Sequence, residues 1–566
     1  MRGDLRTRRR HARERGVPPA PDPHADCPGG VARGGSRPDL TGPALFSSSP
    51  ERSDRVAVLA DGASRTYGEI DAQSRRLAQH LLAGAAADLD GARVGFLMEP
   101  GFEYVVTQWA IWRAGGIAVP LCPDHPAREI EYVIDDADCA ALIGAGKTGR
   151  RVEGPARERG IPFHDAADAS AYPSASDAAA DSCAPELGPL PPVGADRPAM
   201  ILYTSGTTGR PKGVVTTHGQ IEAHIRSLLD AWKWGPNDRI LHVLPLHHTH
   251  GVVNALCCPL YAGAAVEFGG PFDPAGTWER LASGDISVFM AVPTIYAKLL
   301  QAWDAADRAT RERWSGGVRP LRLMVSGSAA LPVRAFERWD EITGHRLLER
   351  YGMTEIGMGL SNPFDGERRP GTVGQPLPGV ELRLVRPATG QVLAEGVEAL
   401  EPGESGEIQV RGPMVFSEYW RRPAETTAAF VDGWFLTGDE AVLEDGYYRL
   451  LGRRSVDILK SGGYKISAVE IEEMLRTHPE VRDCAVVGIP DEEWGERIAA
   501  AVVPDPGAAP RPDSLPERLD PWVRERLARY KVPRAWLCVA DLPRNAMGKV
   551  RKPAVQALFH GPRRPS

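Results

Sequence analysis

The chain contains 566 residues, too many for a single compact core, so we expect two or more domains. Apolar residues make up 42% and charged residues 25%, as in ordinary globular proteins, and the net charge of −7 argues against nucleic acid as the main partner, because a phosphate backbone attracts basic proteins. No apolar run approaches the roughly 20 residues of a membrane-spanning helix, so no span is expected.

Residues 1–44 are interpreted as a disordered or leader segment. Residues 1–40 are rich in Arg, Pro and Gly and show no hydrophobic period. Nine arginines in this stretch are compatible with a mitochondrial transit peptide, but its five acidic residues are of a kind that such peptides usually avoid. We therefore predict a cytoplasmic protein and keep the mitochondrial matrix as the alternative.

Regular structure is predicted from about residue 56 onward, where strand-like and helix-like segments alternate. The expected elements are helices at 71–82, 219–232 and 468–476, a helix that ends at Gly344, and strands at 199–203, 213–216, 321–325 and 485–489. A stretch rich in Ser, Ala, Asp and Pro, 169–195, is expected to be a surface loop. This alternation predicts a layered α/β architecture, followed after Gly452 by a small α+β unit.

The eight cysteines are scattered without paired spacing, and Cys257 and Cys258 are adjacent within an apolar stretch. Disulfide frameworks and metal sites usually show regular pairs of cysteines. We therefore predict reduced, buried thiols in preference to disulfides or metal ligands.

The most specific motif is a loop of small and hydroxyl residues that directly follows the strand 199–203. It consists of Thr204, Ser205, Gly206, Thr207, Thr208, Gly209, Arg210, Pro211, Lys212 and Gly213. Small residues let the backbone approach an anion, the hydroxyls add donors, and Lys212 supplies a compensating charge. The glycine spacing, the absence of Ser or Thr after Lys212 and the following strand distinguish it from a Walker loop.

This loop resembles the phosphate loop of the adenylate-forming superfamily, which includes acyl-CoA synthetases, nonribosomal adenylation domains and luciferases. The resemblance extends from about residue 45 to 558, with further motifs in the same order. It implies that a second group of residues contacts ATP, with the Tyr351 ring over the adenine: Ser328, Arg350, Tyr351, Gly352, Met353, Thr354, Asp439 and Arg453. It also implies that Glu355 and Thr208 hold Mg²⁺, and that Lys549 steadies the substrate carboxylate and the α-phosphate.

The reaction implied by this resemblance joins a carboxylic acid to coenzyme A. The carboxylate attacks the α-phosphorus of ATP to give an acyl-adenylate and pyrophosphate, and the CoA thiol then accepts the acyl group. No nucleophilic side chain is needed, so catalysis would rest on positioning and on charge neutralisation by Mg²⁺, Lys212 and Lys549.

The resemblance also predicts the domain organisation. A large domain, 45–452, would contain layered α/β subdomains and a small β-barrel, and a small, mobile α+β lid, 458–566, would follow a hinge at 453–457. Ser455 lacks the charge usual at the hinge pivot, so no pivot residue is assigned. In the lid, a glycine-containing loop resembles the CoA-binding loop of the family: Ser461, Gly462, Gly463, Tyr464 and Lys465. An exposed loop charge is the alternative interpretation of Lys465.

The acid-binding pocket is expected between the segments 245–251, 293–298 and 324–332, whose combined sequence is similar to malonyl-CoA synthetases. Lys298 follows Thr294 by one helical turn, where a fatty-acid enzyme would carry an apolar residue, and its cation could take a second carboxylate. Ser326 and Ser328 would add donors, and His250 would flank the reacting carboxylate. The alternative for Lys298 is a helix lysine with its ammonium in water.

The sequence therefore predicts an AMP-forming malonate–CoA ligase that uses ATP, Mg²⁺ and CoA. Methylmalonate is an expected second substrate, because one methyl group is discriminated weakly. The alternatives are a ligase for another short-chain or aryl acid, and a stand-alone adenylation enzyme that loads a carrier protein. Small molecules are the expected partners, and the sequence does not indicate an oligomeric state.

Overall fold

The computed structural model describes most of the chain, namely residues 50–82, 87–166, 189–204, 210–397, 404–454, 456–461, 464–491, 494–505, 514–545 and 548–559. Several predictions lie outside these residues. They concern the leader at 1–44, most of the loop at 169–195, the five phosphate-loop residues at 205–209, Ser455, and Gly462 with Gly463.

The first sheet has nine strands and is parallel through its centre, with antiparallel strands at both ends. Its order is β15 (Gln375–Pro376), β14 (Gly357–Ser361), β13 (Leu348–Met353), β12 (Leu323–Ser326), β11 (Val288–Ala291), β9 (Arg239–His242), β10 (Ala265–Phe268), β1 (Val56–Ala60) and β2 (Ala63–Thr66).

The second sheet has seven strands, of which β8 and β19 are antiparallel to their neighbours and the other five are parallel. Its order is β19 (Glu418–Tyr419), β8 (Lys212–Thr217), β7 (Pro198–Thr204), β4 (Ile117–Pro120), β3 (Arg93–Leu97), β5 (Ala141–Gly144) and β6 (Phe163–Asp165).

Alternate residues of the strands serve two different hydrophobic cores. In β11, Val288 and Met290 join a core that the two sheets share, whereas Phe289 and Ala291 join a core on the other face of the first sheet. The shared core contains α1 (Tyr67–Leu82), α2 (Phe102–Arg113), α7 (His218–Trp232), the π-helix η4 (His250–Cys257) and α8 (Cys258–Ala262).

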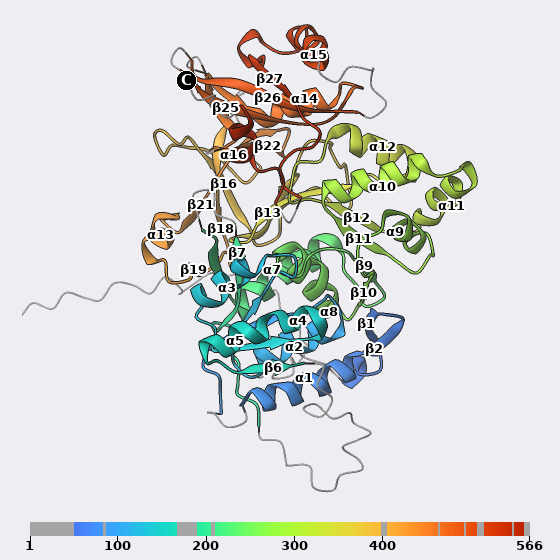
Figure 1. Cartoon of the computed structure of the whole chain (residues 1–566), viewed down its shortest axis with the longest axis vertical. Helices are drawn as coiled ribbons and strands as arrows, with labels where there is room; N and C mark the ends of the chain where they lie inside the picture. Colours follow the sequence, from blue (N-terminus) through green and yellow to red (C-terminus); the bar gives the residue numbers. More distant parts are fainter. Residues whose placement is uncertain are drawn as a thin grey trace, which may run out of the picture. The chain divides into compact units, whose positions relative to one another are not determined.

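Two further groups of helices cover the outer faces of the sheets. The first sheet is covered by α9 (Pro274–Leu281), α10 (Pro293–Ala305), α11 (Arg308–Val318) and α12 (Val333–Thr343), which lie together beside β11 and β12 in Figure 1. The second sheet is covered by α3 (Ala127–Asp136) and α5 (Glu153–Arg159), with the short α4 (Gly146–Gly149) nearby. Period-two burial on both faces is typical of layered α/β folds.

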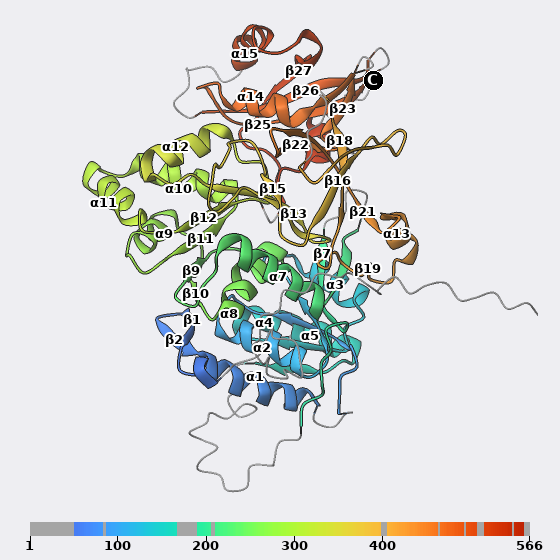
Figure 2. The same ribbon diagram turned by 180° about the vertical axis from the view of Figure 1, so that it is seen from behind.

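The remaining two sheets are smaller. The predicted small barrel is a six-stranded antiparallel half-barrel formed by β17 (Val392–Glu395), β16 (Glu381–Val385), β18 (Gly406–Arg411), β21 (Trp434–Glu444), β20 (Phe430–Val431) and β22 (Tyr447–Arg453), with α13 (Pro423–Ala428) before β20. The C-terminal α+β unit consists of β24 (Tyr464–Ser467), β23 (Ile458–Ser461), β26 (Gly495–Pro504), β25 (Val481–Asp491), β27 (Ala535–Cys538), α14 (Ala468–Arg476), α15 (Leu515–Arg524) and α16 (Lys552–Leu558). Figure 2 shows α14 and α15 beside its sheet.

Local sequence signals account for several boundaries. The Thr217 side chain accepts a 3.2 Å hydrogen bond from the Gln220 amide in a capping box, which begins α7. Gly344 adopts a left-handed φ of 76° and ends α12 as predicted. The predicted α/β class is thus confirmed, and no helix in the described ranges is long and apolar enough to cross a membrane.

Candidate active site

Polar side chains gather at the carboxyl ends of the parallel strands in the first sheet, where α/β proteins usually bind ligands. Strand β12 ends at Ser326, whose neighbours in register are Ala291 and Glu349. Strand β9 ends shortly before the segment 245–250, which leads into the π-helix η4. Short π-helical stretches are frequent at functional sites.

Arg350, on β13, is a buried cation that forms no ion pair with any described residue. It is 3% exposed. One Nη donates to Ser328 Oγ at 3.3 Å, while Nε has no hydrogen-bond partner. Burial lowers the pKa of this guanidinium to about 9. Such a group is stabilised by a bound anion, because an uncompensated buried charge is costly.

Gly327 makes room for this guanidinium. A Cβ at position 327 would lie 2.5 Å from the Cζ of Arg350, closer than real contacts allow. A side chain at position 327 would therefore exclude the Arg350 guanidinium from its place beside Ser328.

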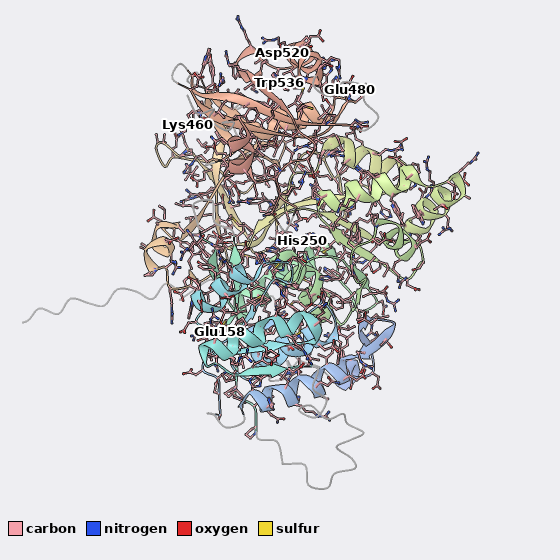
Figure 3. The ribbon with its side chains drawn as sticks, viewed as in Figure 1. Glu158, His250, Lys460, Glu480, Asp520 and Trp536 are labelled. Carbon is pink, nitrogen blue, oxygen red and sulfur yellow. The ribbon has the colours of Figure 1, made fainter. Side chains whose placement is uncertain are left out.

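His250 lies beside the same hydroxyl and deep inside the molecule (Figure 3). Its Nδ1 is 3.3 Å from Ser328 Oγ, and its Nε2 has no partner. Burial and the nearby positive charge of Arg350 hold the pKa of His250 well below its usual range, so the ring is neutral. Further buried polar atoms without a partner are His248 Nε2, Thr249 Oγ1, Ser326 Oγ and both amide atoms of Asn254. Because buried polar atoms in a protein core are nearly always hydrogen-bonded, this number of unpaired atoms favours a ligand-binding site.

Glu355 lies in the tight turn between β13 and β14, with Thr354 before it. It is 6% exposed, and Tyr419 donates its hydroxyl hydrogen to Glu355 Oε1 at 2.9 Å. Burial raises the pKa of the Glu355 carboxyl, a shift that a nearby cation would oppose. Tyr419 was not predicted from the sequence as a site residue, and no local motif distinguishes it.

Asp439, on β21, is held by two predicted nucleotide-binding residues. Tyr351 donates its hydroxyl hydrogen to Asp439 Oδ2 at 2.6 Å, and Arg453 Nε donates to Oδ1 at 2.9 Å. Asp439 is 8% exposed. The structure therefore brings together three residues that are far apart in the sequence and that the resemblance assigned to adenosine.

Lys212, at the start of β8, forms an ion pair with Glu425 of α13, and its ammonium is 5.2 Å from the centre of the Tyr419 ring. Tyr419 thus lies between Lys212 and Glu355. The ion pair is partly exposed, so a phosphate can compete for Lys212 at modest cost.

Lys549 precedes Val550, which pairs with Arg544, and the Lys549 amide donates to Asn545 Oδ1 at 2.9 Å. The side chain is reachable by solvent and yet crowded by protein atoms, so that partial desolvation and repulsion from Arg350 lower the pKa of its ammonium. A Cβ on the preceding Gly548 would lie 3.4 Å from Thr294 Oγ1 of α10. The C-terminal turn therefore approaches the predicted acid-binding helix.

Lys298 follows Thr294 by one turn of α10, as predicted, but its side chain is exposed. Its ammonium is 5.8 Å from the centre of the Phe272 ring, and it forms no ion pair within the described part of the chain. Its contact with the substrate stays a prediction.

The model of the AMP-binding enzyme family matches residues 45–420, and that of the AMP-binding enzyme C-terminal domain matches 470–549. The chain belongs to the AMP-binding enzyme family.

Two relatives and one solved structure illustrate the similarity. The mitochondrial malonate–CoA ligase of Homo sapiens is 45% identical over 93% of both chains, and the malonate–CoA ligase of Arabidopsis thaliana is 40% identical over 90% of this chain and 87% of its own. ATP-bound MatB from Rhodopseudomonas palustris is 36% identical and superposes with a TM-score of 0.80 over 92% of this chain and 99% of its own.

In this AMP-binding enzyme the predicted CoA residues are only partly described. Ser461 is 2% exposed at the end of β23, and Tyr464 is 54% exposed. The Tyr464 ring stacks on Tyr530, with ring centres 4.3 Å apart. Gly462, Gly463 and the side chain of Lys465 lie outside the described residues.

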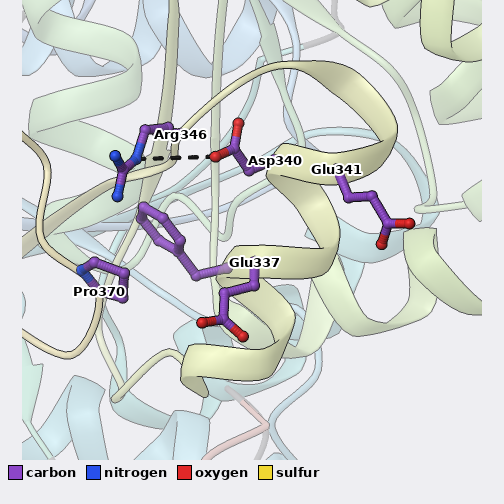
Figure 4. A pocket seen from close by; sticks show the side chains of 6 residues that line it. Glu337, Asp340, Glu341, Arg346 and Pro370 are labelled. Carbon is purple, nitrogen blue, oxygen red and sulfur yellow. Dashed lines mark ion pairs between the residues drawn. The ribbon is translucent and has the colours of Figure 1, made fainter.

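One surface pocket of this enzyme is lined mainly by residues of α12 (Figure 4). It is lined by Phe336, Glu337, Asp340, Glu341, Arg346 and Pro370, with Arg346 3.9 Å from Asp340. Three carboxylates would repel both a nucleotide and an organic acid, so this pocket is not the active site.

Proposed function

We propose that this enzyme ligates malonate to CoA with ATP, through an acyl-adenylate, and releases AMP and pyrophosphate. The observation that carries the choice of a diacid is the buried, unpaired guanidinium of Arg350. A monocarboxylate would spend its one charge at the reacting centre, whereas malonate brings a second carboxylate that can pair with this cation.

The side chains around Arg350 suit that assignment. Ser326 and Ser328 can donate to a carboxylate, and the neutral ring of His250 has an unpaired Nε2 toward which a proton donor or acceptor can turn. Lys298 is exposed, so a carboxylate paired with it would remain in water, and the ion pair would contribute less to the binding free energy. Arg350 is therefore our first candidate for the second carboxylate, and Lys298 our second.

The remaining site residues would bind and orient ATP. Tyr351 and Asp439 would hold the adenosine, Lys212 would leave Glu425 for the triphosphate, and Lys549 would bridge the reacting carboxylate and the α-phosphate. Glu355 is a suitable ligand for Mg²⁺, a hard cation that prefers oxygen, and the ion when bound would neutralise phosphate charge. Bringing two anions together is the main barrier to this reaction, so cations at fixed positions are the principal catalytic groups.

The relatives support both the reaction and the substrate. The human and Arabidopsis proteins are malonate–CoA ligases, and a solved malonyl-CoA ligase, 38% identical with a TM-score of 0.61, holds methylmalonyl-CoA and AMP. We therefore include methylmalonate as a substrate. A cytoplasmic location remains our prediction, and the mitochondrial relatives support the matrix as its alternative.

A product assay tests this proposal. The enzyme is incubated with ATP, Mg²⁺, CoA and one acid at a time: malonate, methylmalonate, acetate, benzoate or octanoate. We expect AMP and malonyl-CoA as the dominant products. AMP with octanoyl-CoA or benzoyl-CoA dominant would retain the reaction and overturn the diacid site.

A further inference from the structure

Three side chains with metal-binding atoms converge outside the groups assigned above. Cys122 and His125 lie in the loop between β4 and α3, and His247 lies in the segment 245–250. The Cys122 sulfur and one ring nitrogen of each histidine all lie within 4.8 Å of one another.

The local backbone explains why Cys122 and His125 face the same way. The His125 amide donates to the Cys122 carbonyl at 3.2 Å, which closes a turn with Pro123 at its first central position. Arg151 donates to the carbonyls of Pro123 and His125 and fixes this turn from outside. Cys-x-x-His across a closed turn is a spacing that can present two ligands to one ion.

His247, the third potential ligand, is buried and has no hydrogen-bond partner for its ring. Its side chain is 9% exposed, and neither ring nitrogen has a hydrogen-bond partner. Buried polar atoms are usually hydrogen-bonded, so a buried imidazole with two unpaired nitrogens calls for a ligand. A metal ion would bind one of these nitrogens.

Glu129 completes the surroundings of the cluster. Its Oε2 lies 3.7 Å from His125 Nδ1. Histidine ligands commonly pair their second nitrogen with a carboxylate in this manner, which orients the ring and increases its basicity.

We propose that Cys122, His125 and His247 bind a zinc ion through one sulfur and two nitrogens, with water in the fourth position. The Cys122 thiol releases its proton to solvent as the zinc–sulfur bond forms, and no electrons are transferred. Bond lengths of about 2.0 Å to nitrogen and 2.3 Å to sulfur place tetrahedral ligands about 3.5 Å apart. The three donor atoms, which lie within 4.8 Å of one another, would approach to this spacing as the ion binds.

The sequence predicts a reduced core thiol at Cys122, and the Cys122 side chain is buried and in no disulfide. A bound ion would join the loop before α3 to the segment that carries His248 and His250.

The test uses the full-length, metal-free enzyme without nucleotide, titrated with Co²⁺ as a spectroscopic probe and then with Zn²⁺ in competition. We expect one Co²⁺ per chain, with a thiolate charge-transfer band and the intense visible bands of tetrahedral cobalt. Zn²⁺ should abolish these bands. Absence of the charge-transfer band in the wild-type enzyme would overturn the proposal.

Variants assign the ligands. Cys122→Ser and His125→Ala should each weaken binding by at least about 100-fold, and Glu129→Gln by about 10-fold. Cys538→Ser, which removes a half-buried thiol of the C-terminal unit that is in no disulfide, is the matched control and should bind as the wild type does. Because His125 is partly exposed, His125→Ala should fold and retain ligase activity even if Cys122→Ser does not. Wild-type affinity and spectrum in His125→Ala would overturn the assignment.

Discussion

Replacement of Arg350 by Met is the most informative test of the diacid site. Methionine fills much of the same space and removes the charge. In the ligand-free enzyme the charge forms no ion pair with the residues that the structure describes, so its removal should not destabilise the fold. Without the charge, the second carboxylate of malonate would be buried and unpaired.

The structure sets the size of the effect. The fall in the pKa of Arg350 from 12.5 to about 9 corresponds to about 5 kcal/mol of unfavourable burial in the free enzyme. Leaving a buried charge without its partner costs about 2–5 kcal/mol, which is roughly a 30- to 4000-fold loss in kcat/KM for malonate. Butyrate has no second carboxylate, so its kcat/KM should change by less than about 5-fold.

The assay measures kcat/KM for malonate and butyrate in the wild type and in Arg350→Met, together with urea unfolding. Lys298→Ala is the comparison variant, and its loss for malonate should stay below about 5-fold because an exposed ion pair contributes at most about 1 kcal/mol. A parallel fall for both acids in Arg350→Met would refute its role in binding the second carboxylate. A larger selective loss in Lys298→Ala would assign that role to Lys298.

Three further predictions concern other groups. Lys549→Ala should abolish adenylate formation but spare CoA capture from supplied malonyl-adenylate, and equal loss of both steps would contradict its assigned role. Glu425→Gln should free Lys212 and lower the KM for ATP by up to about 5-fold, whereas an unchanged KM would place Lys212 away from the triphosphate. Burial raises the pKa of Glu349 from 4.5 to about 8, so its contribution to stability is present below pH 4.5 and is lost as the pH rises toward 8. The stability of Glu349→Gln relative to wild type should therefore rise by up to about 1.4 kcal/mol per pH unit in this range, and a constant difference in urea unfolding would contradict it.

Elements with strong local signals could be predicted from the sequence. The helix predicted at 468–476 coincides with α14, where Ser467 accepts a capping hydrogen bond from the Glu470 amide at 3.1 Å. The strand expected after the phosphate loop is β8. The six described cysteines form no disulfide, as predicted, and five of them are buried.

Features that depend on long-range packing could not be predicted. The π-helix η4 has no periodicity of its own, and Gly251 in it is required because a Cβ there would lie 2.1 Å from the Pro245 carbonyl oxygen. The sequence motif that contains Arg350 assigned this residue to ATP, and it does not show that the guanidinium lacks an ion-pair partner among the described residues.

The shared carboxylate of Asp439 has a kinetic consequence. Arg453, at the start of the proposed hinge, and the ribose of ATP would draw on the same two oxygens. By thermodynamic reciprocity, a nucleotide that weakens the Asp439–Arg453 contact makes hinge rotation easier, and rotation, which frees the Asp439 carboxylate from Arg453, in turn strengthens nucleotide binding by the same factor. The step that admits CoA and the step that lets AMP depart would then be coupled through one side chain.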